Sequence, residues 1–599
     1  MGNHYFIITG EEAGPKSNKM GGIWNVIDGE AHTLATLFNS STLQSKDEAK
    51  ILVVGPYYGH SGADWNRGLN RITNMEEFGP LSIDVKLQKS IELLEKSGIK
   101  VFTGEKRVGK TRISYLQFQT SYFGKILTTY MGKEITLENR VKAEAYQLFG
   151  LDSLKYENMS NGLEYTHYLS FSYAISELAR LLISSVSETG ETVKRDTSSN
   201  QVFISCPGVS LHCHEFGVFY AAARLKKLGV PVGSIATLHA TLPGRTAGYN
   251  SILKRRNNDS TWPPSVPENM AALEALALYA DTVTTVGEST RQEIRLFYGI
   301  NGIVIRNGIN IGSDKIDWKL KERCLERMQT FLSENLYKHH GGERIEPKKI
   351  IPIFTISRIE VENKGYPELL DSLVALDHII TNSILGGHME EGIKVICFLV
   401  TAETPKKNLP EGFPVNLPKE VLVGNELRIQ QMIEKKGLDF SKIVRGKCSV
   451  AAVLYPQILS ISDGGLGMEV EDFMAGCCAG IFPSRYDPFL LTGLEAGKEG
   501  TPSVVSQVCG FSDAIKAIEP LVEGLGGVIV VDNINLSYYE AVLDYALAVS
   551  YFTRNFIEDR VKYKLLCGEA FLLAKDMGLE EPTKQYYELI KGSTLFCRQ

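Results

Sequence analysis

The residues with the clearest chemical potential lie in the stretch Ile481–Gly500, which holds two carboxylates eight positions apart. The apolar run Ala479–Phe482 predicts a buried strand, and Leu490–Lys498 has the composition of a helix. Asp487 then falls in the loop before the helix, and Glu495 falls two turns into it. Both acids can therefore face a ligand held over the start of the helix.

The first backbone amides of this helix, at Leu490, Leu491 and Thr492, lack intrahelical acceptors and suit a phosphate. Acids for hydroxyl groups beside amides for a diphosphate fit a sugar nucleotide. The alternative is an ordinary strand, loop and helix with two solvent-exposed acids.

Acid-Pro-aromatic at Asp487-Pro488-Phe489, followed by Glu495, resembles the paired-acid signature of retaining glycosyltransferases with two Rossmann-like domains, the GT-B class. The sequence segments 472–477 (DFMAGC) and 481–484 (IFPS) are similar to the corresponding segments of the animal and fungal glycogen synthases.

Two cations follow the predicted strand Ile350–Ser357. Arg358 ends this strand, and Lys364-Gly365 opens a helix six positions later. Fixed cations at the end of a strand can hold a departing diphosphate, although such residues often face solvent. Their spacing resembles the diphosphate-binding pair of the same family.

A glycine pair, Gly21 and Gly22, lies between the predicted strand Tyr5–Thr9 and the helix Ile23–Phe38. This layout can bring backbone amides close to a phosphate, although a glycine pair by itself is usually a turn. Asn18 to Gly22, with Lys19 in it, resembles the opening motif of the family, which implies donor binding there.

Histidines end two further predicted strands, Val209–His214 and Ile235–His239. The resemblance places His239 close to the donor sugar near its anomeric centre. It also implies a donor contact at Asn307 and an acceptor side formed by His214, Glu215 and Arg245.

Two other patterns suggest different chemistry. His212 and His214 share one face of a strand, so they could ligate a metal ion. No second pair of ligands is near in sequence, however, and a hydrogen-bonded pair in the core is favoured.

Gly104–Thr111 satisfies the P-loop pattern of nucleotide-binding proteins. The alternating residues after it predict a strand rather than a helix, so we expect a hairpin over Val101–Phe118.

Strands alternating with helices predict an α/β protein with parallel sheets covered on both faces. We expect two Rossmann-like doubly wound domains facing a cleft, with ligands at the carboxyl ends of the strands. The C-terminal helices should pack back across the domains. The predicted parts are an N-terminal acceptor-side domain, a helical connection, a donor-side domain and the C-terminal helices, at residues 1–312, 313–345, 346–535 and 536–599 respectively.

A chain of 599 residues is too long for one core, and 43% hydrophobic with 22% charged residues is an ordinary globular composition. The net charge of −6 gives no electrostatic reason to expect nucleic acid or an anionic membrane. Ten cysteines without a CxxC pair, no signal-peptide pattern and no long apolar run predict a cytoplasmic protein.

The resemblance implies transfer of glucose from UDP-glucose to the 4-hydroxyl of an α-1,4-glucan end, with retention and without a metal or other cofactor. Arg358 and Lys364 would neutralise the leaving UDP, Glu495 would bind the ribose and Asp487 would bind the donor sugar. The partners are then a nucleotide sugar and a glucan or oligosaccharide, and self-association stays open.

This chain departs from the family inside the donor pocket. Asp487, Phe489, Leu490 and Gly493 stand where the family has Glu, Trp, Gly and Pro. The family's arginine-rich activation helix is not evident. Two alternatives therefore stay open: a related enzyme with another donor or acceptor, such as GDP-mannose, and a catalytically weak sugar-nucleotide or glucan-binding regulator.

Overall fold

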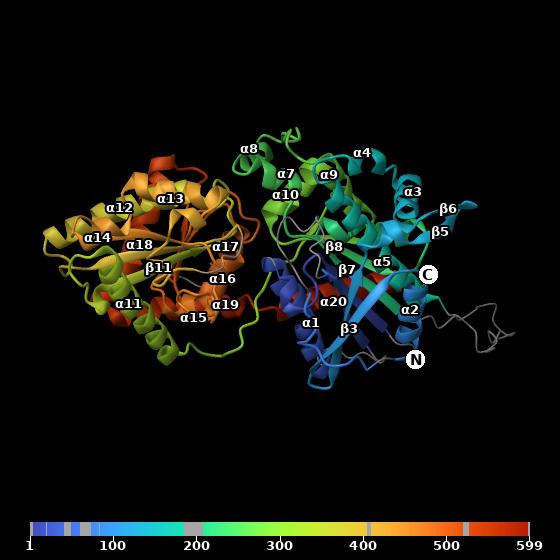
Figure 1. The fold of residues 1–599 in the computed structure, drawn as a ribbon, viewed down its shortest axis with the longest axis horizontal. Coiled ribbons are helices and arrows are strands. Elements are labelled where there is room, and N and C mark those ends of the chain that lie inside the picture. Colours follow the sequence, from blue (N-terminus) through green and yellow to red (C-terminus); the bar gives the residue numbers. More distant parts are fainter. Residues whose placement is uncertain are drawn as a thin grey trace. The chain divides into compact units, whose positions relative to one another are not determined.

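The computed structural model describes residues 4–19, 21–40, 49–59, 73–82, 84–184, 208–403, 406, 409–518 and 526–596, with side chains to residue 591 (Figure 1). The chain forms two compact units. The first comprises Met1–Ala247, Lys254–Gly308 and Leu579–Gln599, and the second comprises Gly248–Leu253 and Ile309–Gly578. The segment 313–345, which we expected to connect the domains, is thus part of the second unit, and the C-terminal helices are shared between the units.

An eight-stranded sheet forms the centre of the first unit, in the order β10-β9-β8-β7-β1-β2-β4-β3. All neighbours are parallel except β3 and β4, which form the predicted hairpin, so the P-loop pattern has no helix after it. A small antiparallel pair, β5 and β6, lies apart from this sheet. The strands are β1 His4–Gly10, β2 Ala49–Pro56, β3 Lys100–Val108, β4 Thr111–Gln119, β5 Leu127–Tyr130, β6 Lys133–Thr136, β7 Gly208–His214, β8 Gly233–Leu238, β9 Thr282–Thr285 and β10 Ile303–Val304.

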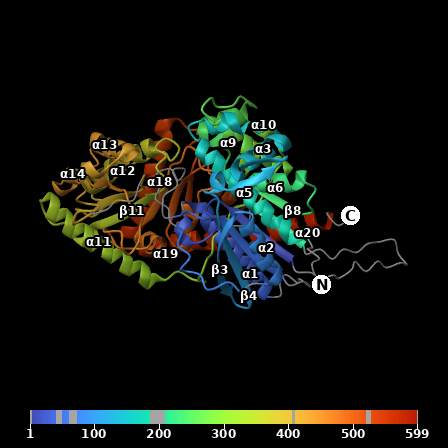
Figure 2. The ribbon, with the colours of Figure 1, turned by 45° about the vertical axis from the view of Figure 1, so that its right-hand side comes forward.

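Each face of this sheet has its own hydrophobic core, because successive side chains of a strand point to opposite faces. Tyr5 and Ile7 of β1 pack with α2, α5 and α6, whereas Phe6 and Ile8 pack with α1 and α20. In Figure 2, α5 and α6 lie near β8, and α20 lies lower in the view. The helices are α1 Gly22–Asn39, α2 Val85–Lys96, α3 Leu137–Phe149, α4 Ser153–Glu157, α5 Gly162–Ile183, α6 Phe219–Lys227, α7 Leu242–Ala247, α9 Glu268–Ala275, α10 Glu288–Tyr298 and α20 Glu580–Phe596. α8, Asn250–Arg256, is divided between the two units after Leu253.

The second unit has a six-stranded, fully parallel sheet in the order β13-β12-β11-β14-β15-β16. Counted along the chain this is the order 3-2-1-4-5-6 of dinucleotide-binding folds, and the direction of winding reverses between β11 and β14. The strands are nearly continuous buried runs, as expected for a sheet covered on both faces. They are β11 Ile350–Ile356, β12 Lys394–Val400, β13 Val450–Tyr455, β14 Ala479–Phe482, β15 Ser503–Ser506 and β16 Val528–Val531.

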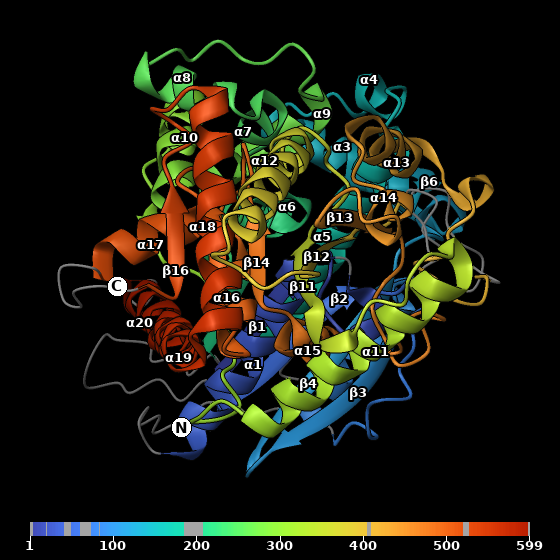
Figure 3. The same cartoon turned by 90° about the vertical axis from the view of Figure 1, so that its left-hand side faces the viewer.

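Helices cover both faces of this second sheet. α12 and α18 lie side by side (Figure 3) and share one core with β11, β12 and β13. α11 packs on α15 and β11, which explains why the segment 313–345 belongs to this unit. The helices are α11 Trp318–His340, α12 Tyr366–Leu385, α13 Gly424–Lys436, α14 Phe440–Val444, α15 Val470–Gly476, α16 Leu491–Lys498, α17 Gly510–Ile518, α18 Tyr538–Glu558 and α19 Arg560–Asp576.

Most predicted elements occur within one or two residues of their expected bounds, and the α/β prediction with two doubly wound sheets is confirmed. The helix expected over 270–280 ends at Ala275 and continues as a 3-10 turn, Leu276–Tyr279. The strand expected at Val202–Cys206 lies outside the described residues. No helix in the described ranges is long and apolar enough to cross a membrane.

Candidate active site

The switch point of the second unit brings together the ends of β11 and β14. Lys364 follows β11, Asp487 follows β14, and Lys364 Nζ lies 2.7 Å from Asp487 Oδ2. The two side chains are only 12% and 9% exposed, so water screens this ion pair poorly. A cation and an acid predicted from separate motifs thus lie in contact at the edge of the sheet where ligands of this fold bind.

Gly365 explains why a glycine follows the lysine. Its φ is +67°, and a Cβ there would lie 1.8 Å from the carbonyl oxygen of Pro483. The loop after β11 therefore packs directly on the loop after β14. The Asn363 carbonyl also accepts hydrogen bonds from the amides of Arg485 and Tyr486, at 2.8 and 3.1 Å. These backbone contacts fix the separation of Lys364 and Asp487.

Arg358 is placed differently from Lys364. Its side chain is 52% exposed, and its guanidinium lies 3.3 Å from Glu360 Oε1. An exposed arginine can reorient toward an anion at small cost, whereas Lys364 is held in place. The two cations predicted to bind one diphosphate therefore lie in different environments.

The start of α16 presents amides without a side-chain cap. Leu490 is the N-cap residue in the left-handed conformation, with φ +74° and ψ +62°, and no side chain bonds to the helix start. The predicted helix thus begins at Leu491, and the amides of Leu491 and Thr492 lie in its first turn. Asp487 Oδ1 accepts a hydrogen bond from the Phe489 amide at 3.4 Å, and Glu495 is half-buried one turn further along.

Leu490 also explains how this chain tolerates its departure from the family. A position that is Gly in the family is expected to need a backbone conformation that only Gly adopts freely. Leu490 keeps that left-handed conformation at a cost of about 1–2 kcal/mol. Its side chain is 6% exposed, so burial of its apolar surface offsets part of this strain.

In the first unit, the glycine pair at the start of α1 already has an anionic partner. The Gly21 and Trp24 amides donate hydrogen bonds to Glu12 Oε2 at 2.9 and 3.2 Å. A carboxylate is favourable at a helix N-terminus for the same reason that a phosphate is. The sequence analysis missed Glu12, whose only signal was an acid in the loop before the helix.

The residues before this glycine pair have separate roles. Asn18 is fully buried and its amide nitrogen donates to the carbonyls of Ala13 and Pro56 at 3.0 and 3.1 Å, which ties the loop to β2. Lys19 is exposed, with its ammonium 5.5 Å from the ring centroid of Trp24. Of the motif, Asn18 shapes the loop and Lys19 supplies an accessible charge; Met20 lies outside the described residues.

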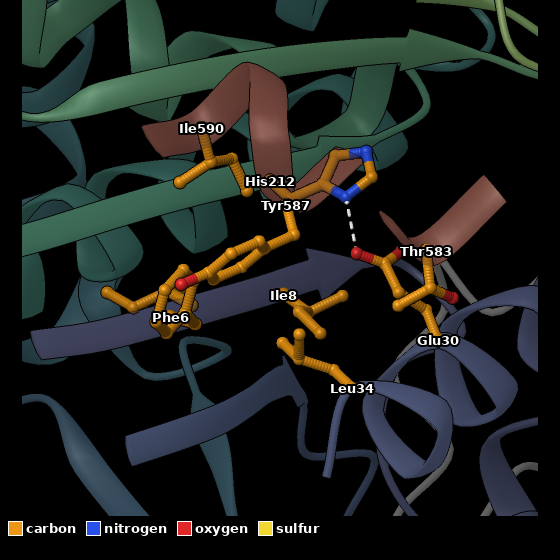
Figure 4. Close-up of a pocket in the computed structure, with 9 residues that line it drawn as sticks. Phe6, Ile8, Glu30, Leu34, His212, Thr583, Tyr587 and Ile590 are labelled. Carbon is orange, nitrogen blue, oxygen red and sulfur yellow. Dashed lines mark hydrogen bonds and ion pairs between the residues drawn. The ribbon is translucent and has the colours of Figure 1, made fainter. Parts of the chain in front are cut away.

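His212 and His214 are both buried, and both hydrogen-bond one shared acid, Glu30. His212 Nδ1 lies 2.8 Å from Glu30 Oε1 (Figure 4), and His214 Nε2 lies 3.1 Å from Glu30 Oε2. Glu30 comes from α1, and Tyr586 of α20 packs on His212 with ring centroids 4.4 Å apart. Sequence reasoning missed Glu30; an acid on the apolar face of α1 was its only signal.

His239 lies directly after β8 and contacts this group. Its Nε2 is 3.0 Å from His214 Nδ1, and its backbone amide donates to Glu215 Oε1 at 2.8 Å. Glu215 itself has φ +71°, a strained conformation for a residue with a Cβ. Strain of this kind is common at functional sites, and here it directs the Glu215 carboxylate to the backbone that follows β8.

A second buried acid, Glu274, holds the next part of the same loop. Both of its oxygens accept from the Leu242 amide, at 3.1 and 3.0 Å, and Tyr298 donates to it. Burial raises the pKa of Glu274 to about 8. Arg245 is half-buried on α7, and Asn307 is buried after β10. Each unit thus contains its own set of the predicted residues.

Two family models match parts of the chain that contain predicted site residues. Residues 429–567 match the family model of glycogen synthase, and residues 209–312 match that of glycosyltransferase family 4. The chain is 22% identical over 570 residues to the liver glycogen [starch] synthase of Homo sapiens, covering 84% of this chain and 72% of that protein. The chain is thus similar to a glycogen synthase over most of its length.

A second curated protein and a solved structure extend the comparison. The glycogen [starch] synthase of Caenorhabditis elegans is 25% identical over 377 residues, 51% of this chain and about half (54%) of the worm protein. A solved structure titled as trehalose-6-phosphate from E. coli with UDP-2-fluoro glucose superposes with a TM-score of 0.51 at 12% identity, over 98% of this chain and 99% of that one. The resemblance and the GT-B fold predicted from the sequence are both confirmed.

Proposed function

We propose that the chain is a retaining glucosyltransferase that transfers glucose from UDP-glucose to the 4-hydroxyl end of an α-1,4-glucan. The observation that supports this most directly is the buried Lys364–Asp487 pair at the switch point, next to the uncapped first turn of α16. These groups offer a cation, an acid and helix amides in one place, which is the set that a nucleotide sugar needs.

The chemistry follows from charge. Breaking the bond between a sugar and a diphosphate builds negative charge on the diphosphate and positive charge on the sugar. Lys364, Arg358 and the amides of Leu491 and Thr492 would stabilise the diphosphate. Asp487 would accept hydrogen bonds from donor-sugar hydroxyls, in addition to its bond with Lys364.

Other roles rest on the relationship to the glycogen synthases. Glu495 would bind the ribose, and His239 would contact the donor sugar. Gly21 and Gly22 would contribute amides to the diphosphate, for which the donor must compete with the Glu12 carboxylate now bonded there. The acceptor glucan would contact Glu215 and Arg245, and His214 would support this side indirectly, because it is fully buried. Lys19 and Asn307 would contribute to the donor side.

A different donor remains the second candidate, because the departures at Asp487, Phe489, Leu490 and Gly493 all lie at or near the start of α16. A panel of radiolabelled UDP, ADP and GDP sugars, with glycogen and short maltooligosaccharides as acceptors, separates the candidates. We expect transfer from UDP-glucose that persists with a chelator present. Preference for another donor would replace the proposed substrate, and donor binding without any transfer would indicate a regulator.

A matched pair of variants ties the activity to the site. Lys364→Ala should lower turnover by roughly a hundredfold through lost stabilisation of the leaving group. Lys419→Ala is the control, because Lys419 also lies 2.7 Å from a carboxylate, that of Glu434, but on the exposed surface of the same unit. Near wild-type turnover of Lys364→Ala would contradict the diphosphate assignment.

A further inference from the structure

A continuous chain of hydrogen bonds links a buried carboxylate on α1 to His239. Glu30 Oε2 lies 3.1 Å from His214 Nε2, and His214 Nδ1 lies 3.0 Å from His239 Nε2. Glu30 is 3% exposed and His214 is fully buried. The other Glu30 oxygen bonds His212, whose second nitrogen lies 2.7 Å from Thr237 Oγ1. The carboxylate is therefore bonded on both sides and cannot rotate away from His214 without losing a bond.

The direction of each proton in this chain follows from the carboxylate. Despite burial, which opposes ionisation, the two histidines lower the pKa of Glu30 to about 2, so it is ionised and can only accept hydrogen bonds. His214 must then donate its Nε2–H. Burial lowers the pKa of His214 to about 4, so its ring is neutral and Nδ1 carries no proton.

The bare Nδ1 of His214 in turn requires a donor, and His239 Nε2–H is the group that faces it. Burial, followed by the neighbouring histidines, lowers the pKa of His239 well below its usual value, so this ring is neutral too. Its proton is therefore on Nε2, and Nδ1 is an acceptor. Among the described residues, His239 Nδ1 has no hydrogen-bond partner, although the residue is only 8% exposed.

We propose that Glu30 is a positioning residue that fixes, through His214, the Nε2–H form of His239, so that His239 Nδ1 accepts a hydrogen bond from a hydroxyl of the donor sugar. The role of His239 toward the sugar rests on the proposed function; the proton arrangement does not. A hydroxyl that donates to Nδ1 gains electron density on its oxygen, which favours positive charge developing on the same sugar ring.

The same three side chains, Glu30, His212 and His214, also have the residue types of a zinc site, with ligand atoms within 4.8 Å of one another. One nitrogen of each ring, however, faces a Glu30 oxygen at hydrogen-bond distance, and the other bonds Thr237 or His239, an arrangement that already satisfies all three groups. Elemental analysis of the full chain as isolated separates the two arrangements. Zinc in a one-to-one ratio would overturn the proposal, and its absence is expected.

The direct test is 15N NMR of the full chain with labelled histidine, because protonated and bare ring nitrogens differ strongly in 15N shift. The chain has 11 histidines, and a His239→Gln spectrum assigns the signals of His239. We expect Nε2 protonated and Nδ1 bare at pH 7. A His239 ring with the proton on Nδ1 would overturn the proposal, and this wild-type measurement does so without any variant.

Glu30→Gln supplies the second measurement, since an amide can donate to one histidine where the carboxylate could only accept. We expect the His239 tautomers to become mixed or reversed, and kcat/KM for the donor to fall about tenfold or more. Glu144→Gln is the control, because it also removes an acid from a buried ion pair, here with Arg224. The control should leave the His239 signals unchanged.

The outcomes are distinguishable. An unchanged His239 tautomer in Glu30→Gln would overturn the positioning role, whatever the activity. The expected tautomer in a chain that transfers no sugar would instead refute the proposed function, and the proposed hydroxyl contact with it.

Discussion

Gly365→Ala is the sharpest test of how the two loops at the switch point position Lys364. The left-handed backbone at φ +67° costs an alanine about 1–2 kcal/mol. In addition, the new Cβ would lie 1.8 Å from the Pro483 carbonyl oxygen, far inside contact distance. Because that atom belongs to the backbone, the loops must separate, and overpacking of this kind costs about 1–3 kcal/mol more. We expect a total loss of about 2–5 kcal/mol.

The control for this experiment is Gly387→Ala in the same unit. Gly387 has nearly the same φ, +70°, but no atom lies within 4 Å of its ideal Cβ. It should therefore lose only the conformational term, about 1–2 kcal/mol. The difference between the two variants isolates the contact between the loops.

The assay is thermal unfolding combined with donor kinetics. For a domain of this size each kcal/mol lowers Tm by about 2–4 °C. Gly365→Ala should lower Tm about 1.5 to 4 times as much as Gly387→Ala and reduce turnover tenfold or more, because separation of the loops moves Lys364 from Asp487. Equal Tm values for the two variants, with full turnover in both, would refute the argument that the backbone contact sets the site.

Two further predictions concern Asp487 and the buried histidines. Asp487→Asn should lower turnover strongly, since loss of the charge weakens its hydrogen bonds by roughly 1–2 kcal/mol. Asp487→Glu should also impair turnover, and adding Leu490→Gly should recover part of that loss. Additive effects of the two changes in a double-mutant cycle would exclude compensation between them. Acid should weaken what His214 and Glu30 contribute to the stability of the first unit: between pH 6.5 and 4 the unfolded chain binds a proton at His214 that the folded state does not, and between pH 4.5 and 2 the same holds for Glu30. Glu274, whose pKa burial raises to about 8, acts in the opposite direction between pH 8 and 4.5, so the comparison with a variant isolates His214. His214→Gln should lose less Tm than the wild type between pH 7 and 4, and equal losses would contradict the neutral state of His214.

The sequence alone determined the elements and the class of fold. The strand Ala479–Phe482 was predicted at its observed bounds, and the helix expected at Ile23–Phe38 is one residue longer at each end, because burial on both faces and helical periodicity are local patterns. Alternation of such segments then implies parallel, doubly wound sheets. The motifs around Arg358, Lys364 and Asp487 also indicated the site in the second unit, because residues at the carboxyl ends of neighbouring strands meet at one edge of the sheet.

Only the tertiary structure decided which groups those residues contact. Glu30 bonds His212 across 182 positions of sequence, and Lys364 pairs with Asp487 across 123. Glu12 accepts from the Gly21 amide, one of the two that we assigned to a phosphate, and α20 completes the core of the first unit from the far end of the chain. The strained backbone of Leu490 and Glu215 was likewise invisible in sequence. Hydrogen bonding, burial and strain depend on the neighbours that folding brings together, and local patterns of residue type contain no record of those neighbours.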